Sequence, residues 1–395
     1  MKQLGLLPKI ILAMALGVMA GSFFPGWIIR VFATFNGIFG NFLGFAIPLI
    51  IIGFIAPGIA LLGKGAGRML GLSAGIAYAS TIGAGLLAFL SASALYPVLL
   101  EKQSLADFEN PEEALLKPYF QIDMPPVMGI MTALLLAFTL GLGLAAIKGT
   151  ALQKTLEDFR QIVEKVIENV IIPLLPIHIF GIFANMTQGG QISAIMGVFI
   201  KVFIMIIALH LIYLFVQYFA AGAAAKRNPF KMMKEMLPAY MTALGTQSSA
   251  STIPVTLKHA KRIGADGKVA DFSVPLLATI HLSGSTITLV SCGMAVMLLH
   301  GQEAALPNML PFILMLGITM IAAPGVPGGA VMAALGLLES MLGFSPTMIS
   351  LMIALYLAQD SFGTACNVTG DGALTVLIDK LSGKDRKGKP QGKAA

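Results

Sequence analysis

The sequence predicts an all-α polytopic membrane protein with eight transmembrane helices and two re-entrant helical hairpins. Of its 395 residues, 56% are hydrophobic and only 11% are charged, and the mean hydropathy is +0.84. These values exclude an ordinary soluble domain. Apolar runs long enough to cross a bilayer recur along the chain, and two further apolar runs are interrupted by glycine, proline and serine.

Eight apolar segments are predicted to span the membrane, since each has about 20 residues or more. The first begins directly after Met1-Lys2 and so resembles a signal peptide, but it has no clear small-residue cleavage site and continues to Ile29. We therefore interpret it as a transmembrane helix. The predicted spans are 5–30, 35–63, 69–99, 124–147, 162–186, 192–224, 269–299 and 345–379.

The charges of the loops orient these spans. The loop between the third and fourth spans is mainly acidic, whereas basic residues gather in the alternate loops, and cytoplasmic loops carry the excess of lysine and arginine. We therefore expect a cell (inner) membrane protein with both termini in the cytoplasm. The net charge of +7 is then a topology signal, and no nucleic-acid partner is expected. The basic residues that carry this signal are Lys2, Lys9, Lys64, Arg68, Lys148, Lys154, Arg160, Lys165, Lys226, Arg227, Lys231, Lys234, Lys380 and Lys384.

Two weaker apolar segments, 236–256 and 306–343, are predicted to enter the membrane and return. Positive charge flanks the first segment on both sides, and the run Ala323-Pro-Gly-Val-Pro-Gly-Gly329 breaks the second in its middle. Broken segments in corresponding positions indicate inverted repeats with a binding site near the midplane. Because exposed non-helical backbone is too costly in lipid, both tips should line a polar cavity.

A polar stripe interrupts the last apolar segment. Asp360, Thr364, Asn367 and Asp371 share one face of a helix, at i, i+4, i+7 and i+11. A charge at membrane depth must face protein, a cavity or a bound cation. No lysine or arginine lies between Lys268 and Lys380 to pair with the acids. The stripe therefore predicts a site for a cation or a cationic ligand group, with a structural ion pair as the alternative.

Two tips and one further break carry candidate ligands. The cluster at 246–252 offers hydroxyls and backbone N–H groups to a carboxylate, although a serine N-cap explains the same residues. The run 324–329 predicts a hinge or a backbone-lined cation site, or is only a turn. Gly284 should allow unwinding that frees carbonyls for a cation. His281 is interpreted as a satisfied core histidine or an asparagine substitute rather than as a proton carrier.

Other chemistry finds less support in the sequence. Cys292 and Cys366 both lie in apolar segments, so they predict no disulfide. An intramembrane serine hydrolase built from Ser248 or Ser73 with His281 is the competing enzyme hypothesis, and a channel is a third class. The histidines at 178, 210, 259 and 300 have no metal-ligand spacing. We therefore do not expect this protein to be an enzyme.

These motifs resemble those of the glutamate-transporter, or dicarboxylate/amino acid:cation symporter, family. The resemblance covers about residues 5–382, and its most specific pieces are Gln247-Ser-Ser-Ala-Ser-Thr-Ile-Pro254, Gly325-Val-Pro-Gly328 and Asp360…Asn367-Val-Thr-Gly-Asp371. It implies a homotrimer of elevator-type transporters, in which a transport domain moves against a fixed scaffold. Residues 1–68 would hold scaffold helices 1–2, 69–100 transport-domain helix 3, 101–190 an extracellular loop and scaffold helices 4–5, 191–382 the rest of the transport domain, and 383–395 a basic disordered tail.

The resemblance also implies roles for individual residues. Asp360 would hold a substrate ammonium, and Thr364 and Asn367 would contact its polar groups. Ser248, Ser249, Val326 and Gly328 at the hairpin tips would hold the α-carboxylate. Sodium would be bound by Asn367 and Asp371, with Thr279, His281 and Ser283 as further ligands.

Departures from the family pattern narrow the expected substrate. Members that carry acidic substrates have an arginine where this chain has Gly363, and without it an acidic side chain would be buried unpaired. Because Asp360 is retained, the resemblance favours a sodium-coupled symporter of small neutral amino acids such as serine, threonine or alanine. Where the family has Asn-Met-Asp, this chain has His281-Leu-Ser283. Because Ser283 replaces the acid, we expect fewer sodium ions per substrate than the relatives that carry acidic substrates use. The alternative is a proton-coupled, or an acidic amino acid or dicarboxylate, symporter.

Overall fold

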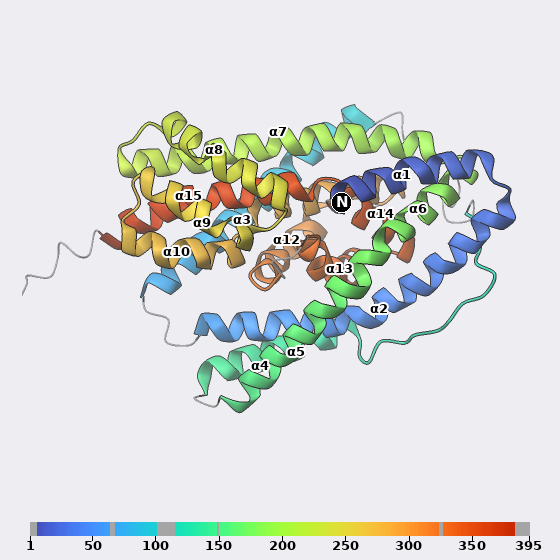
Figure 1. Ribbon diagram of the computed structural model, residues 1–395, viewed down its shortest axis with the longest axis horizontal. Coiled ribbons are helices and arrows are strands. Elements are labelled where there is room, and N and C mark those ends of the chain that lie inside the picture. Colours follow the sequence, from blue (N-terminus) through green and yellow to red (C-terminus); the bar gives the residue numbers. More distant parts are fainter. Residues whose placement is uncertain (1–5, 64–67, 101–114, 148–149, 324–326, 384–395) are drawn as a thin grey trace, which may run out of the picture.

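The computed structural model describes residues 6–63, 68–100, 115–147, 150–323 and 327–383 (Figure 1). Within these ranges all the regular secondary structure is helical and there is no strand, in agreement with the predicted class. The predicted basic tail 383–395 lies outside the described residues beyond its first position. The elements are α1 (Leu6–Phe23), α2 (Gly26–Gly63), α3 (Arg68–Leu100), α4 (Ile130–Ala146), α5 (Ala151–Val166), a π-helical turn (Ile167–Ile171), α6 (Ile172–Gln188), α7 (Ile192–Ala225), α8 (Pro229–Thr246), α9 (Ser249–Arg262), α10 (Gly267–Ile280), α11 (Ser283–Leu299), α12 (Leu306–Met320), α13 (Gly329–Leu342), α14 (Pro346–Leu357) and α15 (Asp360–Gly383).

The described residues contain six helical spans that are long and apolar enough to cross a membrane, or seven if the bent pair α14–α15 counts as one. Three of the six are longer than 32 residues, and one of them runs from Ala151 to Gln188 through α5, the π-helical turn and α6. The apolar helix α4 is shorter and lies where the fourth span is predicted. The chain is therefore polytopic. The eight predicted spans correspond to these six spans together with α4 and the bent pair α14–α15.

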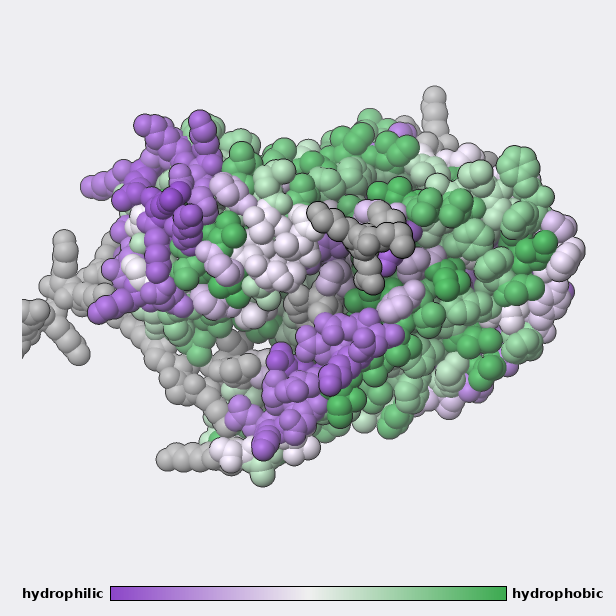
Figure 2. All heavy atoms as spheres, viewed as in Figure 1, coloured by the Kyte–Doolittle hydropathy of each residue, from purple (hydrophilic) through white to green (hydrophobic). Residues whose placement is uncertain are grey.

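Two of the predicted boundaries are wrong. The first break falls at Phe24–Pro25 rather than between residues 30 and 35, because proline cannot continue the α1 ladder of hydrogen bonds. In addition, α5 begins at Ala151, eleven positions before the predicted 162. The charged residues of α5 lower its hydropathy, so the start of this helix was not predicted. Leu156 and Val163 on one face of the helix are buried, and its polar residues form the hydrophilic stripe in Figure 2.

The helices pack as two groups. In one group α2 packs on α4, α5 and α6, and α1 packs on α6. In the other, α15 packs on α7, α8, α9, α10 and α11, and α3 packs on α11 and α12. Fewer contacts join the groups, chiefly those of α13 with α2 and of α14 with α6. The long helices α2 and α7 lie on opposite sides of the view in Figure 1.

Helix breaks are concentrated in the second group. The pairs α8–α9 and α12–α13 form helical hairpins at the two segments where hairpins are predicted. Between them, α10 ends at Ile280 and α11 begins at Ser283, so His281 and Leu282 form a non-helical break. The axes of α14 and α15 meet at an angle of 59°.

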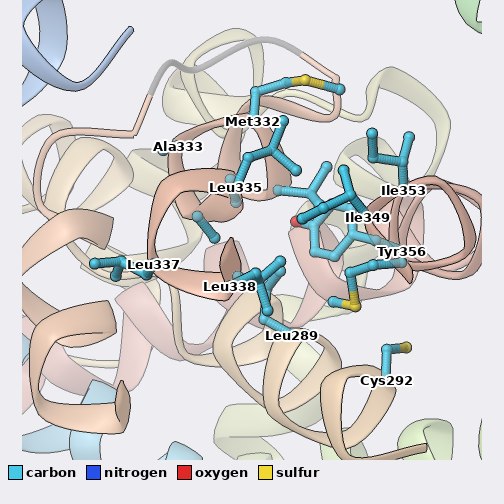
Figure 3. Packing of buried hydrophobic residues seen from close by; sticks show 14 of the residues in the cluster. Leu289, Cys292, Met332, Ala333, Leu335, Leu337, Leu338, Ile349, Ile353 and Tyr356 are labelled. Carbon is cyan, nitrogen blue, oxygen red and sulfur yellow. The ribbon is translucent and has the colours of Figure 1, made fainter. Parts of the chain in front are cut away.

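The arm α13 of the second hairpin is buried by apolar packing. Leu335 and Leu338 of α13 lie against Leu289 of α11 and Ile349 of α14 (Figure 3). All four side chains are buried, and their close contacts add many small van der Waals attractions. This packing fixes α13 beside α14, and so brings the start of α13 close to the bend before Asp360.

Candidate functional site

Four chain breaks surround one small buried cavity. They are the tip of α8–α9, the break between α10 and α11, the tip of α12–α13 and the bend between α14 and α15. The cavity has a volume of about 30 Å³, which holds about one water molecule. An amino acid therefore fits only if the lining segments separate. The lining residues are Gln247, Ser249, Ala278, Thr279, Leu282, Ser285, Ala323, Ala330, Tyr356, Asp360, Thr364 and Asn367.

Asp360 provides the only charged side chain among the described residues that line the cavity. It is the first residue of α15, is 5% exposed, and its Oδ2 accepts a hydrogen bond of 2.7 Å from the backbone N–H of Gly328. Gly328 precedes α13 with φ of 75°, a conformation that favours glycine. A carboxylate accepts about four hydrogen bonds, so Asp360 has capacity left for an ammonium group.

Asn367 joins α15 to the start of α11. Its Oδ1 accepts hydrogen bonds from the backbone N–H groups of Gly284, at 2.7 Å, and Ser285, at 3.3 Å. Its Nδ2 donates to the hydroxyl of Ser285 at 3.0 Å. Two of the first N–H groups of α11, which have no partner within the helix, are satisfied in this way. Asn367 is therefore held in one orientation at the cavity wall.

Gly284 does not unwind the chain, so that expectation was wrong. It lies inside α11, and its carbonyl accepts hydrogen bonds from His210 Nε2 at 3.0 Å and from the Thr288 hydroxyl at 3.2 Å. The break lies at His281–Leu282 instead. A glycine is required at 284 because a Cβ there would lie 2.4 Å from the Gly363 carbonyl oxygen. Gly284 thus allows α11 to approach α15 closely.

The hydroxyl cluster at the first tip divides into two roles. Ser248 is the N-cap of α9, and its hydroxyl accepts from the Ser251 N–H at 3.3 Å. Ser249 is buried and lines the cavity. Gln247, between the two helices, has φ of 54° and also lines the cavity. The capping explanation therefore describes Ser248, while Ser249 contributes to the cavity wall.

Of the other residues predicted to contact the substrate, some line the cavity and others do not. Thr364 lines the cavity, whereas Gly363 does not, because a Cβ at Gly363 would meet the α11 backbone, 3.5 Å from Ser285 N. Val326 lies outside the described residues.

Asp371 and His281 form a buried pair behind the cavity. The two side chains are 1% and 0% exposed, and His281 Nδ1 lies 2.8 Å from Asp371 Oδ1. The remaining predicted ion ligands lie nearby in the sequence but face different partners. The Thr279 hydroxyl donates to the Leu276 carbonyl at 2.7 Å, and Ser283 Oγ lies 3.5 Å from Gln217 Nε2. Because α10 ends at Ile280, the carbonyls of its last turn have no partner within the helix.

Several site residues were not predicted. Tyr356 and Ser285 line the cavity, Ser80 and Gln217 contact the break between α10 and α11, and His210 contacts the first turn of α11. A signal for two of them exists, because His210 and Gln217 are polar residues seven positions apart in an apolar span, and so share a helix face. Ser80 carries no such signal in a helix rich in small residues.

The arrangement defines the class of protein. Broken helices that surround a buried polar site are typical of secondary transporters. This chain belongs to the sodium:dicarboxylate symporter family, because the family profile matches residues 6–381.

Two relatives with a recorded function are similar over most of their length. The serine/threonine transporter SstT of Streptococcus suis (strain 05ZYH33) is 27% identical over 340 residues, which are 84% of this chain and 94% of the relative. The serine/threonine transporter SstT of Acinetobacter baylyi (strain ATCC 33305 / BD413 / ADP1) is 26% identical over 394 residues, 96% of this chain and 98% of the relative.

Proposed function

We propose that this protein is a sodium-coupled secondary active symporter of small neutral L-amino acids of the serine, threonine and alanine class. One observation carries the substrate assignment: Asp360 is the only charged side chain that the described residues place around the cavity. It can pair with the ammonium of an amino acid, and no basic side chain there can pair with a second carboxylate. The names of the two relatives favour the same substrates.

Individual residues take distinct parts in this proposal. Asp360 binds the ammonium, Thr364 and Asn367 contact polar groups of the substrate, and the N–H groups and hydroxyl at Ser249 meet the α-carboxylate. Gly328, which now donates to Asp360, is released when an amine arrives and hairpin α12–α13 moves. Thr364 offers a hydroxyl to the substrate side chain, and the described lining of the cavity provides no cation for an acidic one.

In this proposal sodium binds beside Asp371. A hard cation prefers several oxygen ligands. The carbonyls at the end of α10, from Thr279 in its last turn to His281 just after it, are oxygens without partners within the helix. The side chains of Ser283 and Asp371 complete the proposed set, and Asn367 joins them when its Oδ1 exchanges the Ser285 N–H, now at 3.3 Å, for the ion. Ion and substrate share Asn367, so each raises the affinity of the protein for the other.

The movement we propose is that of an elevator. The division of the helices into two packing groups supports it, because α3 and α7–α15 can move as one body against α1, α2 and α4–α6. We also propose a homotrimer in the cell (inner) membrane, which the mass of the detergent-purified protein would test. Both termini are proposed to be cytoplasmic, which the accessibility of cysteines introduced near them would test.

Uptake by the purified protein in liposomes tests the function directly. Serine, threonine, alanine, aspartate and succinate are offered with an inward sodium gradient, with an inward proton gradient, or with neither. We expect saturable uptake of the neutral amino acids with sodium alone. Uptake of aspartate or succinate in preference to serine would overturn the substrate class, and accumulation on a proton gradient without sodium would overturn the coupling ion.

A further inference from the structure

A chain of hydrogen bonds runs from the helices α3 and α7, through His281 in the break between α10 and α11, to Asp371. His281 Nδ1 lies 2.8 Å from Asp371 Oδ1 on α15, and His281 Nε2 lies 3.0 Å from the hydroxyl of Ser80 on α3. The amide nitrogen of Gln217 on α7 donates to the same Ser80 hydroxyl at 3.0 Å and lies 3.3 Å from His281 Nε2. The hydroxyl of Tyr213 donates to the Ser80 carbonyl, which holds Ser80 in place.

The donors and acceptors of this chain have one consistent direction. The Gln217 amide donates to Ser80 Oγ, so the Ser80 hydroxyl proton is available to His281 Nε2. The imidazole then carries its proton on Nδ1 and donates it to Asp371. Both ring nitrogens are occupied, so the His281 ring has no lone pair left to bind an ion. An outer contact of this kind fixes the orientation of a ligand group.

The chain occupies one oxygen of the carboxylate and not the other. Asp371 Oδ2 is buried and has no hydrogen-bond partner among the described residues, and the same is true of Gln217 Oε1. Leaving a carboxylate oxygen buried without a partner costs free energy, unless a cation meets it. We infer that Ser80 and Gln217 are positioning residues, which act through His281 to hold Asp371 with one oxygen directed to sodium. This inference rests on the proposed function, in which Asp371 binds that ion.

The sodium dependence of serine uptake tests the inference. Ser80→Ala and Gln217→Met remove the donors while keeping the helices, and we expect the sodium concentration for half-maximal uptake to rise about tenfold, as for the loss of an outer contact at a metal site. The serine KM at saturating sodium should stay unchanged. Ser80→Thr keeps the hydroxyl and should behave as the wild type.

A matched control separates positioning from general packing. Ser73 lies on the same helix α3, and its buried hydroxyl has no hydrogen-bond partner among the described residues. Ser73→Ala should therefore leave the sodium dependence unchanged. A second readout without transport is the thermal stabilisation of the purified protein by sodium alone, which depends on the sodium affinity and should need about tenfold more sodium in Ser80→Ala.

The outcomes are distinct. If wild-type uptake needs sodium but Ser80→Ala and Gln217→Met match Ser73→Ala in both measurements, the positioning role is overturned while the proposed function stands. If wild-type uptake and stability ignore sodium, the proposed function falls and this inference with it. If Ser80→Ala does not fold, the decision rests on Gln217→Met.

Discussion

At the scale of single residues, the site is defined by one carboxylate and the groups it can meet. Asp360 lies at the start of α15, facing the cavity and bonded to Gly328 of the opposite hairpin. The bond is made by a backbone N–H, which an ammonium can replace as a donor. In the proposed function, Asp360 therefore links recognition of the amine to the position of hairpin α12–α13.

Replacing the charge should separate binding from folding. In Asp360→Asn the amide oxygen can still accept from Gly328, so the fold should persist, but the ammonium loses a charged partner worth about 3 kcal/mol. We expect uptake of serine to fall about a hundredfold. Asp271→Asn, at an exposed acid of α10 paired with Lys261, is the control and should keep normal uptake. Near-normal serine uptake by Asp360→Asn would contradict the role given to Asp360.

Substitution of Gly363 tests the substrate class. A Cβ at Gly363 makes only an ordinary contact with Ser285 N at 3.5 Å, so Gly363→Ala should keep serine uptake. In Gly363→Arg, the added guanidinium should reduce serine uptake at least about tenfold, since it brings a charge beside a site built for a neutral side chain. Competition by aspartate against labelled serine is the second measurement, and it should increase. Unchanged serine uptake in both variants would show that residue 363 does not select the substrate.

The identities of the site residues were more predictable than their partners. Acids and amides inside an apolar segment stand out because lipid excludes them, so Asp360, Asn367 and Asp371 were found. The bond between Asp371 and His281, ninety positions apart, was not found, because the helix spacing relates only residues on the same element. Gly284 was misinterpreted because glycine serves both unwinding and close packing, and only the neighbouring Gly363 carbonyl distinguishes the two.

At the scale of elements, close packing of α11 against α15 holds the site together. Asn367 of α15 caps the start of α11, and Gly284 lets the two backbones approach. Small residues at helix contacts have this use in membrane proteins, where lipid provides no hydrophobic driving force between helices. The two hairpins were predictable because glycine, proline and serine interrupt their apolar runs. The start of α5 was not predictable from hydropathy, because residues 151–161 are rich in charged and polar side chains and precede the apolar stretch that starts at 162.

Two glycines of α11 provide a matched test of this packing. Gly284→Ala would place a methyl group 2.4 Å from the Gly363 carbonyl oxygen, and the overpacking should cost about 1–3 kcal/mol. Gly293→Ala lies on the same helix, where a methyl group would meet only Leu338 Cδ2 at 3.9 Å, and should be neutral or slightly stabilising. The midpoint of thermal unfolding in detergent should fall for the first and not for the second. Equal midpoints would remove the packing role of Gly284.

At the scale of the whole molecule, the question is which parts move. A few close contacts join the two packing groups. His178 of α6 lies 3.2 Å from the hydroxyl of Ser350 on α14, and a Cβ at Gly58 of α2 would lie 2.8 Å from the Cβ of Ala322, just after α12. If one group slides along the other during transport, these contacts must break in each cycle. Contacts within a group, such as that of Gly21 with Thr187 between α1 and α6, must persist.

Paired cysteines at these two places distinguish movement between the groups from movement within one. Gly58→Cys with Ala322→Cys brings two thiols within the reach of a disulfide or a mercury bridge across the groups. Gly21→Cys with Thr187→Cys does the same within one group, where a Cβ at Gly21 would lie 2.6 Å from that of Thr187. Because that Cβ would also lie 2.4 Å from the Ala184 carbonyl oxygen, this pair serves as the control only if its reduced form takes up serine. With Cys292 and Cys366 replaced by alanine, cross-linking should stop serine uptake in the first pair, and reduction should restore it. The second pair should cross-link without loss of uptake. Full transport by the cross-linked first pair would mean that the two groups do not move past each other at α2, and the elevator would have to be abandoned.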